Sequence, residues 1–132
     1  MKQITGINHV GLRVRSLETA RAFYEQLGFE FIIGPIGPEP VAVMLHPSGI
    51  NINFILNAST DVSTSNVLMD LPDKHTGFTH IALEIDDIEA VQQQLAARGT
   101  TITETVELPD GTVFIFVRDP DGNVIEFHKP VD

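Results

Sequence analysis

The chain has 132 residues, of which 42% are hydrophobic and 20% are charged, and this is enough to bury the core of one compact domain. Eighteen acidic residues against eight lysines and arginines give a formal net charge of -10, which disfavours nucleic acid and the anionic face of a membrane as partners. Without cysteine, a signal-peptide pattern or an apolar run that could cross a bilayer, we expect a cytoplasmic protein with neither disulfides nor thiolate ligands.

The first half of the chain predicts a strand, a helix and then three more strands. INHVGLRV at 7–14 alternates in character as a strand does, and LETARAFYEQL at 17–27 has a helical period. Ser16 is the expected N-cap of this helix, and Gly28 is expected just beyond its end. Three strand-like runs follow, namely GFEFII at 28–33, PVAVMLH at 40–46 and NINF at 51–54.

The second half repeats this pattern. TGINHVGLRV at 5–14 returns as TGFTHIALEI at 76–85, and HPSGININF at 46–54 returns as DPDGNVIEF at 119–127. We therefore predict two tandem βαβββ modules within a single domain covering 1–132, because a half of this size cannot bury its sheet alone. The second half is predicted to have a helix at 87–98, with Asp87 as its cap and Gly99 just beyond its end, followed by strands at 100–108 and 112–118. The two modules cover about 4–56 and about 76–129, and a polar linker at about 57–75 joins them.

Four polar residues occupy equivalent places in the two modules. His9 matches His80 on the first strand of each module, and Asn53 matches Glu126 on the last strand. If these strands line one concave face, two histidines and a carboxylate would converge, which suits divalent iron, manganese, nickel or cobalt, and zinc as well. Each histidine alone could instead be a buried structural ring, but Glu126 lies among apolar residues, where a carboxylate without a partner is costly.

Other candidate residues have competing interpretations. His128 shares the strand face of Glu126 and could support it, carry a proton or simply be a polar strand end, which is our interpretation. Arg13 could bind a substrate carboxylate or be a solvated strand-end residue. Phe54 and Phe114 could line a pocket, although phenylalanines at strand spacing commonly belong to the core. His46 and His75 are expected to contact solvent.

The motifs HVGLRV, GFTHIALEI and FVRDPDGNVIEF resemble the vicinal oxygen chelate superfamily, which includes glyoxalase I, methylmalonyl-CoA epimerase, fosfomycin and bleomycin resistance proteins and extradiol dioxygenases. The resemblance covers nearly the whole chain. It implies an α+β fold in which the two modules form a curved mixed sheet, one divalent metal ion on His9, His80 and Glu126, a small-molecule substrate and a homodimer.

Asn53 departs from the glyoxalase I pattern, which has a ligating glutamate at this place. A neutral amide is a weak ligand and cannot act as a base. The resemblance therefore implies metal-dependent chemistry of a glyoxalase or dioxygenase type on an oxygen-chelating substrate, with Glu126 also able to take a proton and Asn53 and Arg13 binding the substrate. The alternative is a metal-free protein that sequesters a small molecule, as bleomycin resistance proteins do.

Overall fold

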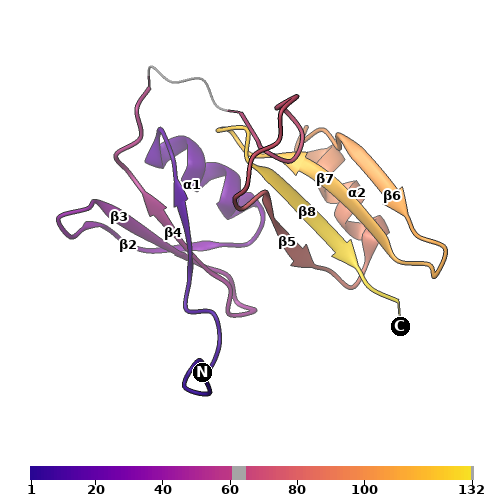
Figure 1. Cartoon of the computed structure of the whole chain (residues 1–132), viewed down its shortest axis with the longest axis horizontal. Helices are drawn as coiled ribbons and strands as arrows, with labels where there is room; N and C mark the ends of the chain where they lie inside the picture. The colour runs from indigo at the N-terminus through magenta and orange to yellow at the C-terminus, as the bar shows by residue number, and fades with distance from the viewer. Residues whose placement is uncertain (61–64, 132) are drawn as a thin grey trace. The chain divides into compact units, whose positions relative to one another are not determined.

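A computed structural model describes residues 1–60 and 65–131, which form two helices and eight strands (Figure 1). The chain divides into two compact units, residues 1–63 and residues 64–132. Each unit has the predicted order of strand, helix and three strands, so the α+β duplication is confirmed. Neither helix in the described part of the chain is long and apolar enough to cross a membrane.

The first unit is a four-stranded mixed sheet with one helix. The first strand is parallel to the last, and the remaining neighbours are antiparallel, in the order β1-β4-β3-β2. The parallel pair requires a long connection, which the helix and the two middle strands provide. The elements are β1 (Val10–Arg13), α1 (Leu17–Gln26), β2 (Glu30–Ile36), β3 (Val41–Leu45) and β4 (Asn51–Ile55).

The second unit repeats this arrangement in the order β5-β8-β7-β6. Its elements are β5 (His80–Glu84), α2 (Ile88–Ala97), β6 (Glu104–Glu107), β7 (Val113–Arg118) and β8 (Val124–Lys129). The strand registers agree with the sequence repeat, because Gly11 pairs with Asn53 in the first unit and Ala82 pairs with Glu126 in the second. Asn53 and Glu126 therefore occupy equivalent positions in their sheets.

Both helices have the predicted N-caps and end one residue before the predicted ends, at Gln26 and Ala97. The Ser16 hydroxyl accepts a hydrogen bond from the Thr19 amide at 3.3 Å, and an Asp87 carboxylate oxygen accepts one from the Ala90 amide at 2.9 Å. Each satisfies an amide that has no partner within the helix. Gly28 and Gly99 follow the two helices with φ angles of 95° and 71°, a conformation that glycine adopts without steric cost.

The side chains of β4 alternate between the face of the sheet that packs on α1, the core face, and the opposite face, which we call the open face. Ile52 and Phe54 are buried, and the Phe54 ring lies 5.4 Å from the ring of Tyr24 on α1. Asn51 and Asn53 alternate with them and project from the opposite face of the sheet. The same alternation in β8 buries Ile125 and Phe127 and directs Glu126 to the other face.

Equivalent tight turns precede the last strand of each unit. Asp119 Oδ1 accepts hydrogen bonds from the amides of Asp121 and Asn123, both at 2.9 Å. In the first unit His46 Nδ1 accepts a hydrogen bond from the amide of Ser48 at 3.1 Å. The imidazole ring is therefore the hydrogen-bond acceptor in this turn, as the Asp119 carboxylate is in the other. His46 is thus a structural turn residue, not only the solvent contact that we expected. The DPDG motif is likewise explained by the turn that starts β8.

Part of the predicted linker is anchored to the second unit. Asn66 Nδ2 donates to the Thr79 carbonyl at 2.7 Å, and Val67 is buried. Arg118 on β7 donates from Nη1 and Nη2 to the two carboxylate oxygens of Asp70, at 2.9 and 2.8 Å. This two-point contact fixes the loop to the sheet. Residues 61–64 of the predicted linker lie outside the described residues.

The Asp70 contact predicts a pH dependence. Hydrogen bonds from Arg118 lower the pKa of the Asp70 carboxyl from 3.8 to about 2. A lowered pKa means that the contact stabilises the fold fully above the unfolded-state value and is lost as the pH falls toward 2. The melting-temperature difference between wild type and Asp70→Asn should therefore be largest above about pH 5 and should shrink as the pH falls toward 2. In an Arg118→Met background, this pH-dependent difference should be much smaller, with the remainder due to the hydrogen bond from the Asn66 amide to Asp70.

Candidate functional site

Glu126 lies between two histidines on the open face of the second sheet. Its Oε1 is 3.2 Å from His80 Nε2, and its Oε2 is 2.7 Å from His128 Nδ1. The exposed fraction is only 10% for the Glu126 side chain and 24% for that of His80. The carboxylate is therefore largely removed from water but has a hydrogen-bonding partner at each oxygen, which offsets the cost of its burial.

The His80 ring is held through its other nitrogen. Nδ1 lies 2.7 Å from the hydroxyl oxygen of Thr79, a group that can either donate or accept a hydrogen bond. The hydroxyl can thus accommodate either neutral tautomer of the ring, including the one that leaves the Nε2 lone pair available. Metal-ligating histidines commonly have their second ring nitrogen held by such a partner.

The donor atoms of His80 and Glu126 fit a divalent cation. Imidazole nitrogen and carboxylate oxygen are both ligands of first-row divalent ions. Two neighbouring ligands of one octahedral ion, each about 2.1 Å away, lie roughly 3 Å apart. The observed separation of 3.2 Å between Nε2 and Oε1 is close to this value.

His9, the third expected ligand, is in the first unit and is exposed. Its Nδ1 lies 2.8 Å from the amide oxygen of Asn8, the residue that corresponds to Thr79 in the repeat. Both candidate histidines are thus held at Nδ1 by the preceding side chain, which leaves Nε2 as the outer nitrogen. In residues 1–60 and 65–131 no group of three or more His, Asp or Glu is arranged to hold a metal ion, so the three-ligand set stays a prediction.

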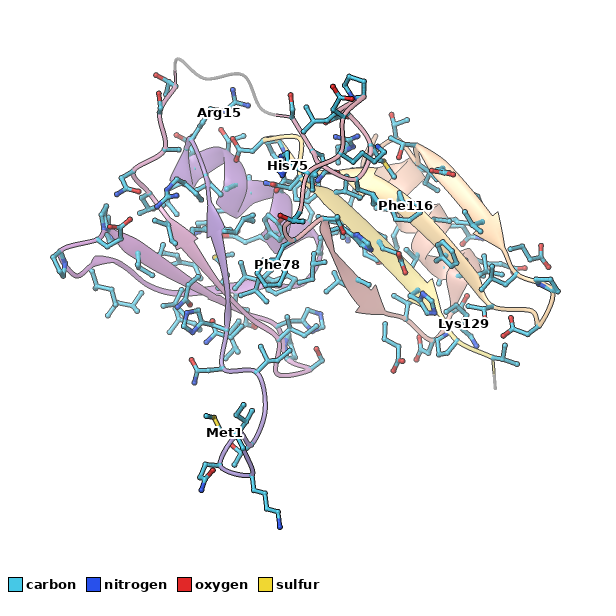
Figure 2. The ribbon with its side chains drawn as sticks, in the orientation of Figure 1. Met1, Arg15, His75, Phe78, Phe116 and Lys129 are labelled. Carbon is cyan, nitrogen blue, oxygen red and sulfur yellow. The ribbon has the colours of Figure 1, made fainter. Side chains whose placement is uncertain are left out.

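Two phenylalanines on β7 flank the histidine and glutamate cluster. Phe116, which is labelled in Figure 2, is paired with Glu126 in the sheet. Its ring centroid is 5.9 Å from that of His80. Phe114 is paired with His128, and the two rings are stacked with 5.4 Å between centroids and 5° between planes. Phe114 therefore contacts the cluster through His128, at the place where we expected it to line a pocket.

On the open face of the first sheet lie Asn51 and Asn53, whose amide oxygens are both buried. Neither oxygen accepts a hydrogen bond from any described residue. A buried acceptor without a donor is costly and is uncommon in folded proteins. Asn53 is opposite Gly11, which adds no side chain beside it.

Arg13 binds an acid of its own unit. Nη2 donates to Glu39 Oε1 at 3.1 Å, and Nε donates to the side-chain oxygen of Asn57 at 3.1 Å. Asn57 also donates to Glu39 Oε1, at 2.9 Å. The guanidinium remains half exposed, but a substrate carboxylate at Arg13 would have to compete with Glu39.

Phe54 does not fit the expected role in substrate binding. Its side chain is fully buried on the helix side of β4, against Tyr24, and so faces away from Asn53. Successive strand residues point to opposite faces of a sheet, so neighbouring positions cannot both line the open face. The structure corrects this expectation, and Phe54 is a core residue.

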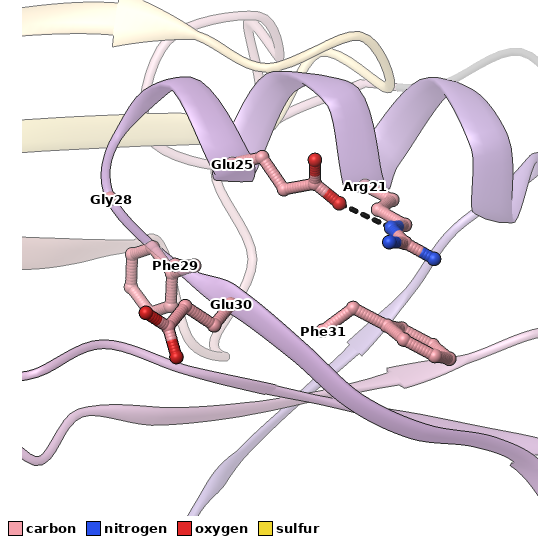
Figure 3. A pocket seen from close by; sticks show the side chains of 6 residues that line it. All are labelled: Arg21, Glu25, Gly28, Phe29, Glu30 and Phe31. Atoms are coloured by element: carbon pink, nitrogen blue, oxygen red, sulfur yellow. Dashed lines mark hydrogen bonds and ion pairs between the residues drawn. The ribbon is translucent and has the colours of Figure 1, made fainter.

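A shallow hollow lies at the C-terminal end of α1 in the first unit, lined by none of the candidate site residues (Figure 3). Arg21 spans it, forming an ion pair with Glu25 while its guanidinium carbon lies 4.2 Å from the centre of the Phe31 ring. Because its one cation is already held by an acid and an aromatic ring, the hollow offers little to a ligand.

Several site residues were missed or misjudged from the sequence. His128 is within hydrogen-bonding distance of Glu126 and is not merely a polar strand end. Asn8 and Thr79 were overlooked, although each precedes a repeated histidine and the repeat itself pointed to them. Asn51 could have been found from the alternation of NINF, which puts both asparagines on one face.

Two duplicated mixed-sheet units, with a histidine and glutamate pair on the open face of the second, define a recognisable class of protein. The chain belongs to the Glyoxalase/Bleomycin resistance protein/Dioxygenase superfamily, whose family model matches residues 6–127. This agrees with the resemblance that the strand and turn motifs indicated.

Relatives of known name include lactoylglutathione lyase from Haemophilus influenzae, which is 32% identical over 127 residues covering 92% of this chain and 90% of that protein. Among solved structures, a glyoxalase family protein from Enterococcus faecalis matches with a TM-score of 0.77 and 23% identity, over 94% of this chain and 97% of the other. A fosfomycin resistance protein from Listeria monocytogenes, complexed with Mn(II) and a dihydroxypropylphosphonic acid, matches with a TM-score of 0.69 and 21% identity, over 96% and 90%.

Proposed function

We propose that the protein is a divalent-metal-dependent enzyme acting on a small substrate that chelates through neighbouring oxygens. The observation that carries this proposal is the distance of 3.2 Å between His80 Nε2 and Glu126 Oε1. The other polar atom of each side chain has a hydrogen-bonding partner, which is Thr79 for His80 and His128 for Glu126. Membership of a superfamily that includes lyases and dioxygenases supports it. The reaction is of a glyoxalase-like lyase or isomerase type, or of a ring-cleaving dioxygenase type.

Three residues would hold the cation. His80 and Glu126 supply a nitrogen and an oxygen from the second unit, and His9 is the third ligand, from the same chain or from a second copy. A bound divalent cation supplies Lewis-acid stabilisation of negative charge developing on a substrate oxygen. Glu126 is the only carboxylate among the three, so it is also our candidate for taking a proton from the substrate.

Asn53 is our candidate for a hydrogen bond to the substrate, because its side chain is a neutral amide. Asn53 also lacks the charge that a ligating glutamate brings to a metal site. This disfavours the reaction of lactoylglutathione lyase itself, although a relative carries that name.

An activity screen tests the proposal. The protein, loaded in turn with Mn²⁺, Fe²⁺, Ni²⁺, Co²⁺ and Zn²⁺, is assayed with a glutathione hemithioacetal, with catechols and with fosfomycin. We expect turnover that chelator removes and that one of these metals restores. Protein that binds none of the five ions contradicts the enzyme proposal and favours a metal-free binding protein of the bleomycin resistance type.

We also expect a homodimer, because members of the superfamily often form one. Sedimentation analysis at micromolar concentration should give twice the mass of a 14.5 kDa chain. A monomeric mass under conditions in which the metal is bound would mean that one chain supplies all three ligands.

A further inference from the structure

Two contacts hold His128 that a solvated strand end does not need. Its Nδ1 is 2.7 Å from Glu126 Oε2, and its ring is stacked face to face on Phe114 with 5° between the planes. Phe114 and His128 are directly paired neighbours on β7 and β8, so the sheet itself sets this stack. The ring plane and the direction of its Nδ1 are therefore fixed together.

The contact determines which way the Glu126 carboxylate faces. A carboxylate that binds a metal ion is ionised and only accepts hydrogen bonds, so in the metal-bound protein His128 Nδ1 would be the donor. With Oε2 held by this donor, the plane of the carboxylate is set and Oε1 is directed at His80 Nε2, 3.2 Å away. Without His128, the carboxylate could rotate about its last bond and lose that direction.

We propose that His128 is a positioning residue that holds Glu126 in the orientation needed to bind a metal ion together with His80. This rests on the proposed function. His128 does for the glutamate what Thr79 and Asn8 do for His80 and His9, which is to hold the atom that does not face the cation. Losing such a supporting hydrogen bond commonly weakens metal affinity about 10- to 100-fold.

The test measures the affinity for Mn²⁺ alone, by calorimetric titration at fixed pH, without any substrate. His128→Leu keeps an apolar side chain against Phe114 but removes the donor, and its dissociation constant should rise about 10- to 100-fold. His128→Asn restores an N–H donor near the same place and should recover affinity to within about threefold of wild type. Unfolding of the metal-free variants is measured in parallel, and we expect little difference between Leu and Asn.

His75→Leu is the matched control. This histidine belongs to the same unit, is exposed, and contacts only the neighbouring Thr76 carbonyl, at 2.9 Å, among the interactions described for it. Its removal should leave Mn²⁺ affinity unchanged, so a general effect of losing a histidine is separated from the specific one.

The outcomes separate the inference from the function on which it rests. Binding of Mn²⁺ by the wild type and not by His80→Ala supports the metal site. If His128→Leu then binds Mn²⁺ as tightly as the wild type does, the proposed role of His128 is wrong. A His128→Asn variant as weak as His128→Leu also overturns it, because the restored donor would have no effect. If wild type fails to bind Mn²⁺, or binds it without His80, the metal site itself is wrong and the inference falls with it.

Discussion

We expect His80→Ala to abolish the thermal stabilisation that divalent cations give to the wild-type protein. An ion present at about 100 times its dissociation constant stabilises the folded state by about 2.7 kcal/mol. For a chain of this length, such a gain corresponds to a rise of roughly 10 °C in melting temperature. The variant should show no rise, because the two remaining ligands, Glu126 and His9, would bind the ion too weakly at that concentration. Differential scanning fluorimetry with Mn²⁺, Ni²⁺, Fe²⁺ and Zn²⁺ measures the effect.

Removing the His80 imidazole also takes away the described partner of Glu126 Oε1, so the rise on adding metal is measured relative to the metal-free melting temperature of the same variant. His46→Ala is the informative comparison, because it removes a histidine that holds the turn before β4. It should lower the melting temperature of the metal-free protein and leave the rise on adding metal intact. Stabilisation of His80→Ala by the same increment as wild type would show that the ligand assignment is wrong.

The second large effect concerns Phe54 and its neighbour Asn53. Phe54→Ala should destabilise the fold by about 3 to 5 kcal/mol, because it leaves a cavity against Tyr24 in the core of the first unit. Asn53→Ala should change stability by less than about 1 kcal/mol, or even increase it, because the change removes a buried oxygen that accepts no hydrogen bond from the described residues. Urea unfolding of the two variants measures both values.

The two changes should have opposite consequences for function. Asn53→Ala protein should bind metal as wild type does but should lose affinity for the substrate. Asn53→Asp keeps the size of the side chain and adds a charge, and it should raise metal affinity if this position lies beside the ion. A strongly destabilised Asn53→Ala, or a Phe54→Ala of wild-type stability, would reverse our assignment of the two faces of β4.

The sequence was sufficient to predict the architecture because its signals were local and repeated. Capping by Ser16 and Asp87 depends on side chains within three residues, and Gly28 and Gly99 mark backbone conformations that few other residues adopt. The repeat then supplied the long-range information. Equivalent residues in two copies must occupy equivalent places, which is why the parallel registers of β1 with β4 and of β5 with β8 agree.

Side-chain roles were harder to predict, for reasons that particular residues make clear. Phe54 was assigned to the pocket because its type suits a ligand, whereas strand alternation next to Asn53 already required the other face. His46 acts as a turn acceptor where the second copy has Asp119, an exchange of residue type that hides a shared role. The Arg118 contact with Asp70 joins residues 48 positions apart and left no pattern in the sequence.

His128 shows how a single strand position acquires its role from neighbours on other strands. From the sequence it shares a face with Glu126, but only the pairing of β7 with β8 brings Phe114 beneath its ring. The stacked ring has its Nδ1 directed at the carboxylate. In our proposal, the orientation of the Glu126 carboxylate therefore depends on Phe114, which is paired in the sheet with His128 and not with Glu126.

A crystal structure of the protein soaked in Zn²⁺, with anomalous data collected at the zinc edge, tests the central claim most directly. We predict one strong anomalous peak at about 2.0 to 2.2 Å from both His80 Nε2 and Glu126 Oε1, with His9 Nε2 of the same chain or of a second copy as a further ligand. Zinc bound elsewhere on the protein, with His80 and Glu126 still hydrogen-bonded to each other, would contradict the proposed metal site.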